Sequence, residues 1–400
     1  MLEMTHLKPT IKKPGKWGIF LKHIMGSNLT SNDLLALKSR SFYLNTAFLD
    51  EEMRIAMTLT YNWLRLQDQV EDGYSDLEEK KEALAEMFYI TSQIARTDLT
   101  DTGIRNLEKR LRSVCKIVKK SNKDIETKVF ADQFCRVWQK SMLEETRSRN
   151  VAIREIIRDS VGIMSVGMRN ALNHGDFQTE EELNDYTYYV AGLVGEKTIE
   201  LLKAIHHTGF ELDPQKAIAL GMGLQYTNIG KNVDEDGKSR IRYPNSRILF
   251  IPKAWYKGVS IEDLLDTRKK EYSEMRHNIL FGTDPEKNSL WTLAKNNLIQ
   301  GAKYISSIPV TDENVARYRL FCMIPLLMAF ETWKVMHQKG AEEVFKGNEE
   351  ATKVTKPTLK KIIDFSSRNA HRRDFTDDFI INYANNPEKY NIPETPRTLA

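Results

Sequence analysis

Residues 57–72 read MTLTYNWLRLQDQVED, and their apolar side chains recur at the spacing of one face of a helix. Asp68 and Asp72 stand four residues apart, so their carboxylates project from one side of that helix, with Glu71 at its edge. Such a pair can share Mg²⁺, which prefers hard oxygen ligands completed by substrate phosphates and water. The alternative is a solvated acidic surface, the commoner fate of acidic pairs on helices.

Helical spacing of apolar residues continues along most of the chain, while strand-like alternation is nearly absent. We therefore predict an all-α protein, and no low-complexity linker or repeat divides it. We expect a flexible basic segment over 1–25, one domain over 26–380 and a tail over 381–400. The predicted helical segments are 50–72, 77–97, 103–120, 125–147, 150–173, 180–206, 215–236, 261–277, 287–306, 313–338 and 355–366.

The composition bounds the partners of this 400-residue chain. Hydrophobic residues make up 41%, enough for a sizeable core, and the net charge of +4 gives no case for a nucleic-acid partner. Three widely spaced cysteines lack zinc-like spacing and fit a reducing compartment. No stretch approaches the roughly 18 to 20 apolar residues of a membrane span. We expect a soluble protein of the cytoplasm or, if a presequence was removed, an organellar stroma.

A second polar motif occurs in TNIGKNVDED at 227–236. Asn228, Asn232 and Asp236 follow one another at four-residue intervals, which places two amide oxygens and a carboxylate in one column on a helix. Asp234 and Glu235 fall on either side and are assigned to solvent. Two polar columns on otherwise apolar helices would be costly to bury without a metal or partner.

Cations suited to phosphate accompany both motifs, although a surface role is the default for each of them. Tyrosines near the motifs are most simply core residues, but a hydroxyl or ring beside a carbocation would serve catalysis. The cations are Arg40, Arg65, Lys231, Arg240, Arg242 and Arg247, and the tyrosines are Tyr61, Tyr186 and Tyr189.

Five blocks together resemble the squalene/phytoene synthase family in order and spacing over about residues 39–347. They are SRSFYLNTAFL, MTLTYNWLRLQDQVED, DYTYYVAGLVG, TNIGKNVDED and FCMIPLLMA followed by VFKG. YVAGLVG, and FCMIP followed by FKG, look like the squalene synthase branch. The resemblance implies a prenyltransferase with an all-α class I isoprenoid synthase (terpenoid synthase) fold, a helical bundle around a central cavity where Mg²⁺ holds an allylic prenyl diphosphate.

The resemblance also implies roles for residues at matching positions. Apolar walls would keep water from the allylic cation while metals and arginines stabilise the departing diphosphate. The expected metal ligands are Asp68, Asp72, Asn228, Asn232 and Asp236; the expected catalytic residues are Tyr61, Tyr186 and Lys231; and substrate binding is expected from Ser39, Arg40, Arg65, Lys197, Arg240 and Arg247.

The sequence departs from the family pattern at several positions. Where the family reads N-x-x-R-D-x-x-x-D, this chain has Lys231 for the arginine and Asn232 for the first aspartate. After residues 345–347 it reads NEEAT instead of a basic loop tied to NADPH, so NADPH is not expected as a cofactor. Leu326 replaces the usual glutamine, and Glu196 and Lys197 add charge after YVAGLVG.

Three functions are compatible with these features. The first is a Mg²⁺-dependent transfer of a geranyl or farnesyl group to a small polar acceptor such as an amino-acid amine, for which algal kainoid biosynthesis offers a precedent. The alternative is head-to-head condensation of two farnesyl diphosphates, as in squalene synthase, with a second prenyl diphosphate as acceptor. The third is a catalytically inactive helical binding protein that keeps the scaffold.

Overall fold

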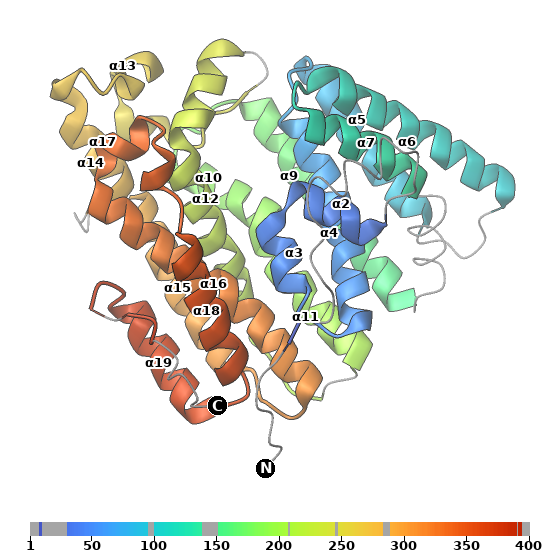
Figure 1. Cartoon of the computed structure of the whole chain (residues 1–400). Coiled ribbons are helices and arrows are strands. Elements are labelled where there is room, and N and C mark those ends of the chain that lie inside the picture. The colour runs from blue at the N-terminus through green and yellow to red at the C-terminus, as the bar shows by residue number, and fades with distance from the viewer. Residues whose placement is uncertain are drawn as a thin grey trace.

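In the computed structural model (Figure 1), the described residues are 8–9, 30–94, 100–137, 151–206, 209–244, 247–282, 289–389 and 391–393. The side chains of residues 40, 41 and 374–376 lie outside this description. Across these ranges every regular element is a helix and no strand occurs, which confirms the predicted all-α class.

A central group of long helices forms the body of the protein (Figure 1). The longest of them, α12, packs along α15 and also contacts α11, the π-helical segment η2 and α16. On the other side, α4 packs against α9 and α11, while α3 contacts α16. The bounds are α3 Arg40–Thr46, α4 Glu51–Glu71, α9 Val151–His174, η2 Tyr188–Gly192, α11 Leu193–His206, α12 Pro214–Arg242, α15 Leu290–Ser307 and α16 Glu313–Lys339.

Shorter helices cover the two sides of this body. The blue and teal elements α2, α5 and α6 pack beside α4 or α9, and α7 packs on α2 and α6 (Figure 1). The green helix α10 contacts α9, α12 and η2, and the yellow to red elements pack around α12, α15 and α16. Their bounds are α2 Ser31–Lys38, α5 Leu77–Ile94, α6 Asp101–Ser121, α7 Ile125–Val137, α10 Glu180–Thr187, η3 Lys253–Tyr256, α13 Ile261–Leu265, η4 Lys270–Tyr272, α14 Ser273–Phe281, α17 Ala341–Phe345, η5 Glu349–Ala351, α18 Lys356–Asn369 and α19 Arg373–Asn385.

Local sequence fixes where the two motif-bearing helices begin. The Asp50 side chain accepts hydrogen bonds from the first backbone N–H groups of α4, and Asp213 does the same for α12, where Pro214 occupies the first turn. Glycine then allows α12 to approach its neighbours. A Cβ at Gly195 would lie 2.1 Å from a carbonyl oxygen of α12, and one at Gly221 would lie 2.2 Å from a carbonyl oxygen of η2.

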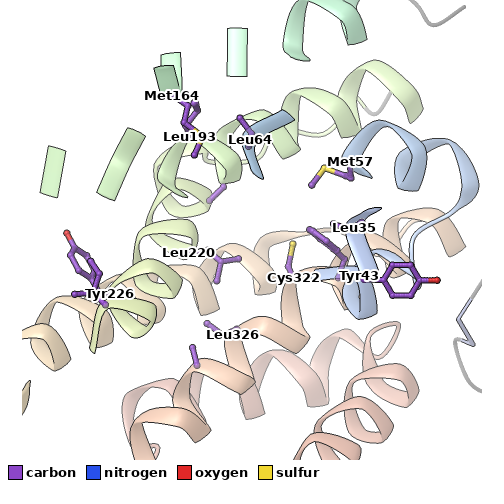
Figure 2. Packing of buried hydrophobic residues seen from close by; sticks show 14 of the residues in the cluster. Leu35, Tyr43, Met57, Leu64, Met164, Leu193, Leu220, Tyr226, Cys322 and Leu326 are labelled. Carbon is purple, nitrogen blue, oxygen red and sulfur yellow. The ribbon is translucent and has the colours of Figure 1, made fainter. Parts of the chain in front are cut away.

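The apolar faces of these helices meet in one continuous core (Figure 2). Side chains from α3, α4, α12 and α16 converge there, including Tyr43, Leu64, Leu220 and Cys322. By length and composition, α16 is the one helix in the described ranges that could cross a membrane, yet 67% of its apolar window is buried inside the protein. It comes closer to a membrane-spanning composition than the sequence analysis expected, because core burial demands the same apolar residues.

Several element boundaries differ from the sequence prediction. The predicted segment 180–206 contains a π-helical turn, and 261–277 separates into two helices with a 3₁₀ turn between them. Helix α19 continues past residue 380, where a tail was expected to begin. The predicted segment 1–25 lies outside the described residues except for residues 8–9, and so does the end of segment 125–147 beyond 137.

Candidate active site

The two polar motifs face one cavity of about 680 Å³ at the centre of the bundle. Asp68 and Asp72 reach it from the C-terminal end of α4, and Asn228, Asn232 and Asp236 reach it from the C-terminal half of α12. Its remaining wall mixes polar and apolar side chains, and the apolar ones come from α3, α4, α9, α11, α12 and α16. Representative apolar lining residues are Phe42, Leu64, Met164, Val194, Leu220 and Phe321.

The α4 carboxylates are each paired with an arginine. Arg65 donates a hydrogen bond to Asp68 at 3.0 Å, and the Arg247 guanidinium lies 2.9 Å from the Asp72 carboxylate. Burial raises the pKa of Asp68 to about 6, and this outweighs the lowering effect of Arg65. The α4 end of the cavity therefore combines desolvated carboxylates with cations that can contact phosphate oxygens.

The pKa of Asp236, the carboxylate on α12, depends on its burial and on the charge of Asp72 at the end of α4. Burial raises the pKa of Asp236 to about 8, and the negative charge of Asp72 adds to this effect. Asp72 belongs to the end of the other helix, so acidic groups from α4 and α12 line the same cavity closely enough for the charge of one to affect the other. Asn228 and Asn232 line the same wall and contribute amide oxygens without charge.

Tyr186 lies beside the α4 motif and is held there by a carboxylate that the sequence analysis did not select. Its hydroxyl donates a hydrogen bond to Glu71 at 3.0 Å, and its ring stacks on Phe250 with centroids 5.2 Å apart. Burial raises the pKa of Tyr186 well above its ordinary value and that of Glu71 to about 8. Glu71 also lines the cavity. Its position three residues after Asp68 could have predicted this, because residues three apart lie on the same face of a helix.

The α3 side of the cavity carries Ser39 and Tyr61. The Tyr61 ring stacks on Phe42 with centroids 4.0 Å apart, and burial raises the pKa of the Tyr61 hydroxyl. Arg40 begins α3, but its side chain lies outside the described residues.

Lys231 faces the cavity one position before Asn232. Burial lowers the pKa of its ammonium group, and the charge of Lys353 lowers it further. Lys353 follows η5, so the segment that replaces the family's basic loop lies close enough to influence this wall.

Two predicted substrate-binding residues do not line this cavity. Lys197 forms an ion pair with Glu200 at 2.7 Å along α11. Arg240 binds Asp176 through two hydrogen bonds of 2.8 and 2.9 Å, and it borders a separate surface pocket. Lys197 is thus paired within its own helix, and Arg240 joins the end of α12 to the loop after α9.

The donor set suits magnesium better than a soft metal. All candidate ligands are carboxylate or amide oxygens, which Mg²⁺ prefers. Desolvation, together with repulsion by the Asp72 carboxylate, raises the pKa values of Asp68 and Asp236, and a dication would relieve both effects. Within the described ranges, no three His, Cys, Asp or Glu side chains gather closely enough to hold a metal by themselves. Ligands from both helices and from substrate would be needed together.

Comparison with known proteins identifies the family. A family model described as squalene/phytoene synthase matches residues 35–358. The chain belongs to this family. It is a prenyltransferase enzyme of the squalene/phytoene synthase family, as the sequence motifs predicted. Relatives include squalene synthase 1 of Arabidopsis thaliana, 29% identical over 82% of this chain, and human squalene synthase, 27% identical over 77%. Phytoene synthase 1 of Zea mays is 27% identical over 56% of this chain.

The matches cover only part of the relatives' own length. The chain spans 68% of the Arabidopsis protein, 63% of the human protein and 45% of the maize protein. A solved structure of TcSQS in complex with the ligand BPH1237 superposes with a TM-score of 0.62 over 91% of this chain and 92% of that chain. At 21% identity this likeness shows the fold, and it confirms the predicted isoprenoid synthase bundle.

Proposed function

We propose that this protein ionises an allylic prenyl diphosphate in a Mg²⁺-dependent reaction and couples the prenyl group to a second prenyl diphosphate. The observation that carries the proposal is that the α4 and α12 oxygen ligands line one cavity, close enough for the charge of Asp72 to affect Asp236, while apolar side chains form part of the same wall. From the sequence alone, a small polar acceptor was the first candidate. The comparisons favour the alternative, because the curated relatives above are named for squalene and phytoene synthesis.

Magnesium, when held by Asp68, Asp72, Asn228, Asn232 and Asp236, would supply charge to stabilise the departing diphosphate. Arg65 and Arg247 pair with the α4 carboxylates, so both guanidinium groups lie at the end of the cavity where we propose that the metal binds. They would bind phosphate oxygens as the C1–O bond breaks and its electron pair leaves with diphosphate.

The apolar wall would then shield the allylic cation from water. The acceptor's double bond attacks C1 of the donor, and the new carbon–carbon bond is completed by loss of a proton. Tyr186 is the candidate to relay this proton: its hydroxyl oxygen would accept the proton from substrate while the hydroxyl hydrogen passes along the existing hydrogen bond to the ionised Glu71 carboxylate.

A small anionic nucleophile is a second candidate acceptor, and Lys231 and Asn232 favour it. Asn232 removes one negative charge from the α12 ligand set, and Lys231 places an ammonium group on the same wall. A carboxylate on the acceptor would pair with Lys231, which would orient an amine toward the donor carbon. The acidic segment at 348–352 likewise leaves NADPH without its expected basic contacts.

Product analysis separates these candidates. Purified protein is incubated with Mg²⁺ and labelled geranyl or farnesyl diphosphate, with and without a panel of amino acids. A product containing two prenyl units supports condensation, and an N-prenyl amino acid supports the second candidate. Failure to release pyrophosphate under both conditions would refute the proposed activity and leave a binding protein.

A variant carrying Lys231→Arg and Asn232→Asp tests the same choice from within the site. These changes restore the arginine and the carboxylate of the family pattern. If a second prenyl diphosphate is the natural acceptor, the variant should keep or increase condensation. If the acceptor is a small anion, the variant should lose amine transfer more than it loses pyrophosphate release.

A further inference from the structure

The last turn of α4 carries Asp68 and Asp72 and is held by side chains from three other segments. The final carbonyl groups of a helix have no partner within that helix. Here the Gln69 carbonyl accepts a hydrogen bond from Asn122 at 3.1 Å, and the Glu71 carbonyl accepts one from Lys80 at 2.6 Å. Arg247 donates to the Asp72 carbonyl. Three carbonyl groups within the first motif are therefore hydrogen-bonded to side chains from α5, from the end of α6 and from the loop after α12.

Lys80 is unusual among these donors because its side chain is completely buried. It is 0% exposed, whereas lysine is among the residue types least often buried. Burying an ammonium group is costly unless its hydrogen-bonding capacity is used. Here the ammonium lies at the negative end of the α4 dipole, where a cation is stabilising.

Other features of the same corner restrict movement of this turn. Asn122 is buried as well, and its amide also donates to the Val118 carbonyl at 2.9 Å, so α6 fixes the orientation of that amide. A Cβ at Gly73 would lie 2.4 Å from the Ser121 hydroxyl oxygen, so the chain leaving α4 passes directly against the end of α6. The packing leaves the turn little freedom.

We propose that Lys80 is a positioning residue for the metal site, acting with Asn122 to keep the carboxylates of Asp68 and Asp72 aimed into the cavity. Lys80 holds the backbone between the two ligands and does not itself contact metal or substrate. The inference rests on the proposed function, because it requires that the α4 carboxylates bind a divalent cation. Removing the outer partners of metal ligands typically weakens metal binding about 10- to 100-fold.

The test measures binding of Mn²⁺ to the full chain in the presence of inorganic pyrophosphate, by electron paramagnetic resonance. Lys80→Met keeps the length of the side chain but removes the donor, and we expect Mn²⁺ binding to weaken about 10- to 100-fold. Lys80→Arg keeps a buried donor and should recover part of the loss. Lys81→Met is the matched control on the same helix, because Lys81 pairs with Glu78 at the surface. It should bind Mn²⁺ as the wild type does.

Wild-type or tighter Mn²⁺ affinity in folded Lys80→Met would overturn the inference, since tighter binding would mean that Lys80 acts only by repelling the cation. If Lys80→Met does not fold, the same measurement is made on Asn122→Ala. This variant removes the hydrogen bond to the Gln69 carbonyl and leaves the buried charge of Lys80 in place. Unchanged affinity in Asn122→Ala would then reject the role. Failure of the wild type to bind Mn²⁺ would refute the proposed metal site itself, which is a distinct outcome.

Discussion

Replacing Asp236 by asparagine should make the metal-free protein more stable while it weakens magnesium binding. In the folded protein, burial and the charge of Asp72 raise the pKa of Asp236 from 3.8 to about 8. The unfolded carboxyl therefore ionises at much lower pH than the folded one. Folding is opposed by this difference whenever the carboxyl would be ionised in the unfolded chain.

The size of the effect follows from the pKa shift. Each pKa unit corresponds to about 1.4 kcal/mol, so the full shift sets an upper limit of ~5 kcal/mol at pH 8, and water in the cavity reduces it. The folded state binds the extra proton between the two pKa values, so stability falls as pH rises through this window. Asp236→Asn removes that loss. We expect it to stabilise the protein by about 2 to 5 kcal/mol at pH 8, and by less at pH 5.

Urea unfolding with a chelator present, at pH 5 and pH 8, measures this difference. Asp234→Asn is the control on the same helix, because Asp234 forms an ion pair with Lys238 at 2.8 Å. The loss of such a pair should change the stability by about 0 to 1 kcal/mol. Equal stability of the wild type and Asp236→Asn at pH 8 would refute the reasoning, since Asp236 would then not be desolvated against Asp72. Added Mg²⁺ should reverse the order of stability, because it stabilises the protein that binds it.

Three further predictions address the site and its frame. Tyr186→Phe loses the hydroxyl that donates to Glu71 and should lower turnover about 10²-fold with little change in Mg²⁺ dependence, as measured by formation of the coupled prenyl product. Gly195→Ala places a Cβ 2.1 Å from a backbone oxygen of α12 and should destabilise the fold by about 2 kcal/mol or more in urea; an unchanged midpoint would contradict that packing. Arg240→Ala leaves the buried Asp176 carboxylate unpaired and should cost about 3 to 5 kcal/mol while the Mg²⁺ affinity of the folded protein stays the same, as calorimetry would show.

The sequence predicts how the acidic and amide groups are arranged on each helix, because that information is local. Helical spacing alone places Asp68 and Asp72 on one face, and Asn228, Asn232 and Asp236 in one column. The structure shows that both faces turn toward the same cavity. That second fact depends on how α4 and α12 pack, and only the family resemblance anticipated it.

The residues that were missed or misplaced depend on tertiary contacts. Lys80 lies in a run of acidic and basic residues, which by itself predicts an exposed side chain. Its burial follows from the packing of α5 beside α4. Arg240 stands one turn after Asp236, yet its side chain turns to Asp176, which lies in the loop after α9. Lys197 similarly finds Glu200 on its own helix. Proximity in sequence cannot tell which partner a long cation selects.

The spacing of apolar residues also could not predict the irregular helical turns. The π-helical turn of η2 shifts the register of the lining residues Val190 and Ala191, whereas the sequence pattern predicted one uninterrupted helix. Gly221 packs closely against the η2 backbone. The sequence shows where a glycine stands, but it does not show which neighbouring backbone comes too close for a larger side chain.

A crystal structure with Mn²⁺ and a thio-analogue of farnesyl diphosphate would show whether the α4 and α12 motifs bind metal and diphosphate together. Anomalous scattering would distinguish manganese from water and from lighter ions. The account predicts manganese between the α4 carboxylates and the α12 column, with Asp68 and Asp236 both within coordination distance and the diphosphate group bridging them. Manganese bound only at the protein surface, or a diphosphate seated away from α4 and α12, would contradict it.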